Sequence, residues 1–63
     1  MAAVQMFTIT IETPNWTYVQ EVELPQLPGK GDAIETRYGT CIVTRAEPSP
    51  DSQYAGKIVC RLP

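Results

Sequence analysis

The most regular hydrophobic pattern lies near the start of the chain, where apolar and polar residues alternate strictly from position 7 to position 12. Side chains point to opposite faces along a β-strand, so this segment is predicted to be a strand with one apolar face. Its apolar positions are Phe7, Ile9 and Ile11. The chain therefore begins with a half-buried strand.

A second strand is predicted at 17–24, joined to the first by a four-residue loop at 13–16. Pro14 cannot take the positive φ of a two-residue type I′ turn, which favours the longer loop. Pairing Glu12 with Thr17 brings the apolar faces of the two strands together, with one polar exception. A slip of one residue would reverse every side chain, so the pattern selects this register.

Two further strands are predicted at 33–36 and 41–47, after a loop at 25–32 that contains two prolines and two glycines. The prolines remove backbone donors and the glycines allow positive φ, so this loop ends the second strand and directs the third. Its PxxP spacing is therefore interpreted as an ordered connection and not as a polyproline ligand.

The turn between the third and fourth strands leaves two registers open. A two- or four-residue loop places Ile34 opposite Val43. A three-residue loop with Gly39 in the left-handed conformation pairs Ile34 with Ile42 instead. We prefer the first register.

The last strand is predicted at 54–62, after a second proline-rich loop at 47–53. Pairing Glu47 with Tyr54 sets Cys41 directly opposite Cys60, with both side chains in the interior. A secreted disulfide scaffold of this size normally carries several bridges and an export signal. Free buried thiols are therefore predicted.

Together these elements predict an all-β protein with a single domain at 1–63 and an ordered core at about 6–62. Thr, Val and Ile make up 17 of the 63 residues, and such β-branched residues favour a pleated, half-buried surface. The predicted architecture is a five-stranded antiparallel sheet, either curled into a small barrel or left half open.

Composition limits the chemistry. The chain has no histidine, so the commonest general base is missing, and its two cysteines are too few for a zinc site. No enzyme activity, cofactor or metal is therefore expected. No apolar run reaches the 18 residues of a membrane span, and the N-terminus lacks the features of a secretion signal. A cytoplasmic protein is predicted.

Aromatic residues near turns are the candidate binding residues, namely Trp16, Tyr38 and Tyr54. A core this small buries only some of its aromatics, and exposed Trp and Tyr are typical anchors for a protein partner. The alternative is that Trp16 and Tyr18 cap one end of the barrel while the tyrosine hydroxyls reach water. We expect a protein-interaction module that binds a partner or forms a homodimer through an exposed edge of the first, second or last strand.

Nucleic-acid binding is the alternative function. Three cationic residues lie on adjoining predicted strands, namely Arg45, Lys57 and Arg61. Arg45 and Lys57 are predicted to point to opposite faces, and the whole chain carries a net charge of −2. Because phosphate binding requires a positive surface, nucleic acid is an unlikely partner.

The order of elements resembles an SH3-like small barrel. More narrowly, one segment is similar to a Leu-Pro-x-x-Gly-Asp-x-Ile step in short uncharacterised bacterial proteins, matched here by Leu27, Pro28, Gly31, Asp32 and Ile34. The resemblance spans residues 6–62 and implies a small β-barrel fold. It implies no activity, since a shared fold does not carry a function with it.

Overall fold

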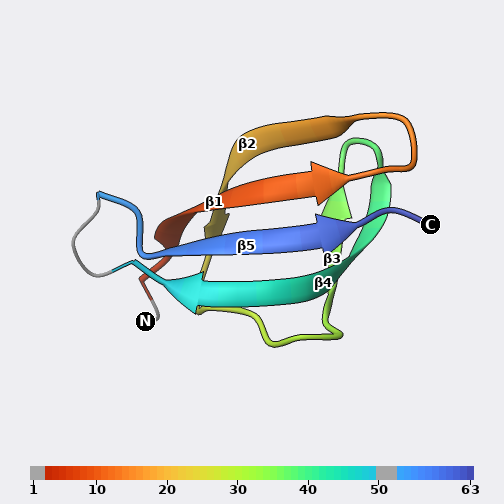
Figure 1. Cartoon of the computed structure of the whole chain (residues 1–63). Coiled ribbons are helices and arrows are strands. Elements are labelled where there is room, and N and C mark those ends of the chain that lie inside the picture. Colours follow the sequence, from red (N-terminus) through yellow and green to blue (C-terminus); the bar gives the residue numbers. More distant parts are fainter. Residues whose placement is uncertain (1–2, 50–52) are drawn as a thin grey trace.

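The computed structural model describes residues 3–49 and 53–63 as one curved sheet of five strands, a half-barrel (Figure 1). The strands are β1 (Gln5–Glu12), β2 (Thr17–Leu24), β3 (Ala33–Thr36), β4 (Gly39–Pro48) and β5 (Gly56–Arg61). The all-β prediction is confirmed. These described residues contain no helix, and hence none that is long and apolar enough to cross a membrane.

The sheet is mixed, with the strand order β2-β1-β5-β4-β3. β1 and β5 are parallel neighbours and every other pair is antiparallel, so the fully antiparallel prediction is wrong for one pair. The cause is simple. Successive strands reverse direction, so the first and the fifth run the same way and pair in parallel when they meet. The edges of the sheet are therefore β2 and β3, and of the three edges predicted only β2 is correct.

The β1–β2 hairpin has the predicted register, with Ile11 opposite Tyr18 and Phe7 opposite Val22. Its four-residue loop is organised by Thr13. The Thr13 hydroxyl donates to the Trp16 carbonyl at 2.8 Å and accepts from the Trp16 amide at 2.9 Å. A threonine side chain that bonds nearby backbone in this way stabilises a turn, which explains why the loop ends at residue 16.

The β3–β4 loop has two residues, one of the predicted lengths, but the pairing that the prediction assigned to this length is wrong. Thr36 pairs with Gly39, and Ile34 lies opposite Cys41. Gly39 has a φ of +122°, a conformation that favours glycine. The observed register differs by two residues from the preferred prediction, so Ile34 still faces the core as predicted.

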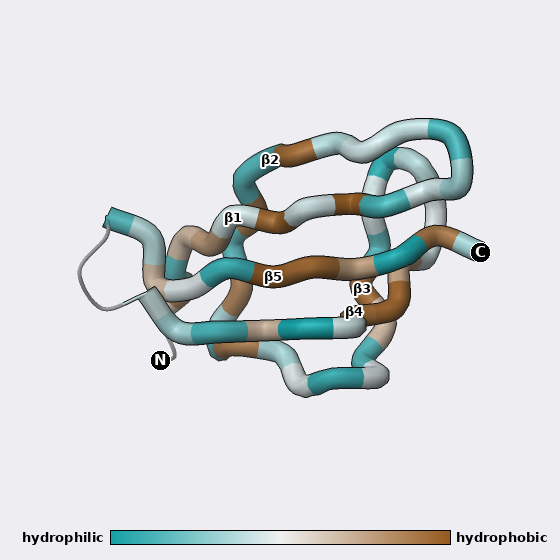
Figure 2. The backbone as a smooth tube through the Cα atoms, in the orientation of Figure 1, coloured by the Kyte–Doolittle hydropathy of each residue, from teal (hydrophilic) through white to brown (hydrophobic). Residues whose placement is uncertain are grey.

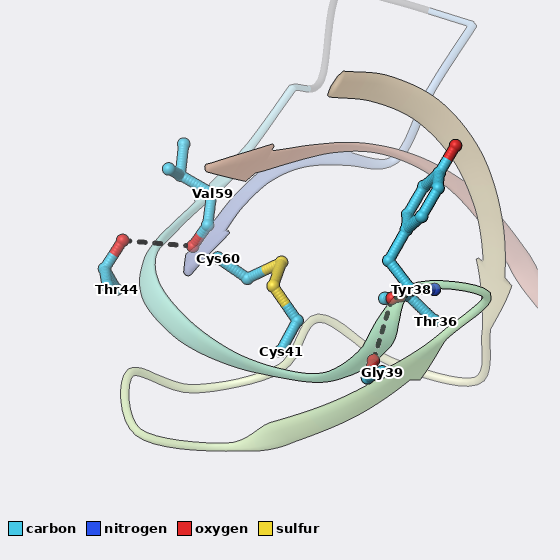
Figure 3. Close-up of a disulfide and its surroundings, with 7 residues drawn as sticks. All are labelled: Thr36, Tyr38, Gly39, Cys41, Thr44, Val59 and Cys60. Atoms are coloured by element: carbon cyan, nitrogen blue, oxygen red, sulfur yellow. Dashed lines mark hydrogen bonds between the residues drawn. A yellow bond between two sulfur atoms is a disulfide. The ribbon is translucent and has the colours of Figure 1, made fainter. Parts of the chain in front are cut away.

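The β4–β5 pairing contains an irregularity that the alternation pattern does not reveal. The register shifts between Val43 and Arg45, as in a β-bulge, and Cys60 lies opposite Val43, not opposite Cys41 as predicted. The Thr44 hydroxyl, at the shift, donates to the Val59 carbonyl at 3.2 Å (Figure 3).

The two cysteines are fully buried, as predicted, but they are not free thiols. Cys41 and Cys60 form a disulfide between β4 and β5, with a Cα–Cα distance of 5.6 Å (Figure 3). The prediction of free thiols is therefore wrong. It relied on the usual bridge number of secreted scaffolds, whereas the two sulfurs are bonded diagonally across β4 and β5, with Cys60 opposite Val43.

The core lies on the inner side of the half-barrel. Its buried residues are Phe7, Ile9, Ile11, Ile34, Cys41, Val43, Ile58 and Cys60. Figure 2 shows an uninterrupted hydrophobic stretch in the middle of β5, as expected for a central strand. Gly56, at the start of β5, is buried, and its neighbours are so close that an added Cβ would lie 2.8 Å from both the Glu47 carbonyl oxygen and Leu27 Cδ1.

The loop at 25–32 explains the Leu-Pro-x-x-Gly-Asp-x-Ile step in structural terms. The Asp32 amide donates to the Gly29 carbonyl at 3.1 Å, and an Asp32 carboxylate oxygen accepts from the Gly29 amide at 2.8 Å. Gly31 has a φ of +93°, as the third position of a type II turn requires. Leu27 packs against the core and Ile34 belongs to it, so this turn sets where β3 begins.

Candidate interaction site

Three aromatic rings meet at one end of the half-barrel. Trp16 packs edge-on against Tyr18 and Tyr38, with ring centroids 5.8 Å and 5.2 Å away, and the centroids of Tyr18 and Tyr38 are 5.2 Å apart. These separations lie in the range that aromatic pairs favour. We refer to Trp16, Tyr18 and Tyr38 as the aromatic cluster.

Each ring is placed by a different element. Trp16 ends the β1–β2 loop, where the Thr13 hydroxyl binds its backbone. Tyr18 is the second residue of β2 and lies on the inner face, opposite Ile11. Tyr38 lies in the β3–β4 turn, and its amide donates to the Thr36 hydroxyl at 3.1 Å. The cluster therefore brings the two edge strands of the sheet together at this end.

The aromatic cluster packs against itself and still faces solvent. The exposed fractions are 42% for Trp16, 48% for Tyr18 and 37% for Tyr38. A hydrogen bond with the Tyr18 hydroxyl raises the pKa of Tyr38 above the ordinary tyrosine value, and the nearby Arg37 guanidinium acts in the opposite direction. The result is a half-exposed aromatic surface with the Arg37 guanidinium beside it.

An open groove of about 490 Å³ adjoins this surface. Its described lining consists of Thr13, Pro14, Asn15, Trp16, Tyr38, Gly39, Thr40, Leu62 and Pro63. None of these residues has a charged side chain. The groove therefore offers aromatic and apolar contacts together with hydroxyl and amide hydrogen bonds, which suit an uncharged segment of a ligand.

Tyr54, the third aromatic residue predicted for the site, lies elsewhere. It precedes β5, and the amide of the next residue, Ala55, donates to the Met6 carbonyl near the start of β1, at the end opposite to Trp16. The Tyr54 hydroxyl donates to the Glu21 carboxylate on β2, and this bond raises the pKa of Tyr54.

The structure therefore joins two of the three predicted residues and replaces the third with Tyr18. The alternation pattern already placed Tyr18 on the apolar face next to the loop, as the capping alternative required. Thr13 and Leu62, which also line the groove, were not predicted. Their participation depends on the β1–β2 loop geometry and on where β5 ends.

The cationic residues of the alternative site share the outer face of the sheet. Arg45 pairs with Val59, and Lys57 and Arg61 lie on the same face of β5. The prediction that Arg45 and Lys57 point to opposite faces is wrong, because the register shift at Thr44 turns Arg45 outward. Arg45 forms an ion pair with Glu47 beside a small hollow of about 90 Å³.

No group of three His, Cys, Asp or Glu side chains within residues 3–49 and 53–63 is placed to hold a metal ion. The two cysteines are bonded to each other in the core. Comparison with known proteins found no matching family model, no similar curated protein and no similar solved structure.

Proposed function

We propose that this protein is a non-enzymatic module that binds another protein through the aromatic cluster and the adjoining groove. One observation supports this most directly. Trp16, Tyr18 and Tyr38 each expose more than a third of their surface although they pack against one another. Binding energy at protein interfaces concentrates in residues of this kind, because they bury a large area with little loss of side-chain entropy.

The groove indicates which part of a partner the site would hold. The side chains that line it carry no charge and the Arg37 guanidinium lies beside Tyr38, so an incoming ammonium would lose its hydration without a partner. An apolar or aromatic segment flanked by hydrogen-bonding groups matches the Trp16 and Tyr38 rings and the polar groups of Thr13 and Asn15.

The experiment is capture of binding proteins from the host lysate by three versions of the full chain: wild type, Trp16→Ala and Ile42→Ala. Ile42 is the matched control, because it is also 42% exposed but lies on the outer face. A protein retained by wild type and Ile42→Ala and lost with Trp16→Ala supports the proposal. Equal retention of a protein by all three versions would show that it binds to a surface other than the aromatic cluster.

Nucleic-acid binding is the second candidate function. It is supported by the shift at Thr44, which turns Arg45 to the same face as Lys57 and Arg61. Dividing the lysate into nuclease-treated and untreated halves separates the two candidates. Retention that disappears on nuclease treatment supports binding through these cations, and retention in both halves supports the protein-binding proposal.

The cytoplasmic location stays a prediction, and the Cys41–Cys60 bond provides a test of it. Cytosolic thiols are kept reduced, whereas disulfides persist in oxidising compartments. Cells that produce the protein are quenched in acid to stop thiol exchange. The protein is then unfolded and treated with an alkylating reagent, and its mass is measured. Two added alkyl groups would support the cytoplasm, and none would indicate an oxidising compartment.

A further inference from the structure

The outer edge of β2 presents a row of backbone groups that the sheet does not use. The Met6 carbonyl accepts from the Ala55 amide at 2.8 Å, and the Glu12 carbonyl accepts from the Leu62 amide at 2.9 Å. The backbone N–H and C=O groups of even-numbered β1 residues therefore point toward β5, and those of odd-numbered β1 residues point toward β2. By the register of the hairpin, the β2 residues whose backbone points away from β1 are Thr17, Val19, Glu21 and Glu23.

This edge is long, and no backbone segment of residues 3–49 and 53–63 pairs with it, although the Tyr54 side chain reaches across to donate to the Glu21 carboxylate. β2 has eight residues, with no proline or glycine between Thr17 and Leu24, whereas the other edge strand, β3, has four. Within the described residues, no loop backbone group bonds to β2. Such an edge is a template for one more strand.

The side chains along this edge select what kind of strand can pair there. On the outer face, the residues with outward-pointing backbone groups include Val19, Glu21 and Glu23. The Glu21 carboxylate accepts from the Tyr54 hydroxyl and keeps its negative charge toward this edge. The inner face at this edge carries Val22 and Leu24, which are half-buried against the core. A complementary strand has cationic residues opposite the two glutamates and apolar residues on its other face.

We propose that β2 binds an extended, cationic segment of another protein as a sixth strand, antiparallel to β2. The proposal rests on the proposed function and adds the binding mode and the partner's chemistry. From its N-terminal end, the segment passes the β2 residues in reverse order, from Glu23 to Val19. It has Lys or Arg at the two positions opposite Glu23 and Glu21 and apolar residues at the two positions opposite Val22 and Val19. The position opposite Gln20 accepts any residue. It runs along β2 toward Tyr18 and so leads into the aromatic cluster.

A second copy of this chain is a poor occupant of the same edge. In antiparallel self-pairing the exposed backbone groups of the two copies must face each other. The register with the most hydrogen-bonded pairs sets Val19 of each copy opposite Glu21 of the other, which leaves the two Glu21 side chains diagonal neighbours. A shift of the register by two residues sets the two Glu21 side chains directly opposite each other. Like charges opposite one another are destabilising, so the glutamates disfavour self-association and favour a cationic strand.

The test is a titration of the isotope-labelled full chain with a synthetic peptide, Lys-Val-Lys-Thr-Val with capped ends, followed by NMR. The expected result is slower hydrogen exchange at the amides of Val19, Glu21 and Glu23. The amides of Gln20 and Val22 should change little, because they already bond to β1. This alternation is the signature of an added strand.

The charge requirement is tested with Glu23→Lys and with Glu35→Lys as the matched control. Both change the net charge equally, but Glu35 lies on the opposite edge, in β3. Glu23→Lys should weaken binding of the cationic peptide by about three- to tenfold and strengthen binding of the same peptide with Glu in place of Lys. Glu35→Lys should change neither by more than about twofold, an effect of net charge alone.

Three outcomes would overturn the proposal. They are an absence of spectral change up to millimolar peptide, equal weakening by both variants, and changes confined to the Trp16 indole and Tyr38. The third would leave the aromatic cluster as the binding surface. Because lysate capture with Trp16→Ala does not depend on the peptide, failure of the β2 proposal and failure of the proposed function are told apart.

Discussion

The two sides of this half-barrel differ in how they are held. On one side, β4 and β5 are joined by the Cys41–Cys60 disulfide, and β5 is flanked by β1, so these strands supply almost the entire core. On the other side, none of the eight residues of β2 is fully buried. There the two edge strands meet through the aromatic cluster.

The two sides illustrate which surfaces a very small domain leaves exposed. A chain of 63 residues buries too little area to cover all of its strands. Here the buried side chains and the disulfide stabilise β1, β4 and β5, which leaves β2 and the aromatic cluster exposed to solvent. The predictions below separate the stabilised side from the open one.

The largest expected effect is on the stabilised side. Replacing Cys41 and Cys60 together by Ala should lower the free energy of unfolding by about 3 kcal/mol, because a bridge between residues 19 positions apart reduces the conformational entropy of the unfolded chain. Urea unfolding, followed by fluorescence of the only tryptophan, measures this. In the wild type, reductant should act slowly in native buffer and quickly in denaturant, since both cysteines are 0% exposed. Loss of less than about 1 kcal/mol would contradict the role given to the bridge.

The second effect concerns the close packing at the start of β5. Gly56→Ala should cost about 1–3 kcal/mol, because its Cβ would lie 2.8 Å from the Glu47 carbonyl oxygen. Gly29→Ala is the control, since the nearest atom to its Cβ is 3.8 Å away and Gly29 has no positive φ. Thermal unfolding of both variants makes the comparison. Equal melting temperatures would show that the strands adjust to the added methyl group.

The third effect is on the open side and should be smaller. A double-mutant cycle of Trp16→Ala and Tyr38→Ala should give a coupling energy of about 0.5–1.5 kcal/mol, the range for packed aromatic pairs. Val19→Ala, on the exposed edge of β2, should change stability by less than about 0.5 kcal/mol. A coupling energy near zero would mean that the rings touch without stabilising the fold.

The smallest effect is a dependence on pH. The bond to Glu21 raises the pKa of Tyr54 above its unfolded value of about 10, so the folded state keeps this proton longer than the unfolded state. The corresponding stability is present below about pH 10 and is lost as the pH rises through the folded pKa. Urea unfolding between pH 8 and about 11.5 should show a smaller decline in Tyr54→Phe than in the wild type. A Tyr54 absorbance titration at the ordinary tyrosine pKa would contradict it.

Local pattern was sufficient for much of the fold. The β1–β2 hairpin follows from the alternation around Ile9 and from Pro14, because both act within a few residues. The bounds of β2 and β3 and the interior position of both cysteines follow in the same way. The β4–β5 register was missed because β5 begins at Gly56 and pairs there with Pro48, so Glu47 lies opposite Lys57 and not Tyr54, and the shift at Thr44 then adds one residue to β4.

The sequence by itself determined the all-β class, the first hairpin and which residues face the core, because side-chain alternation and turn chemistry are local. Only the tertiary structure decided that β1 and β5 pair in parallel, that Cys41 bonds Cys60, and that Tyr38 reaches the other aromatic rings. Each of these depends on which distant strands become neighbours. Which strands become neighbours in the sheet depends on how a single small core packs and on how long loops close, and no local sequence pattern encodes that choice.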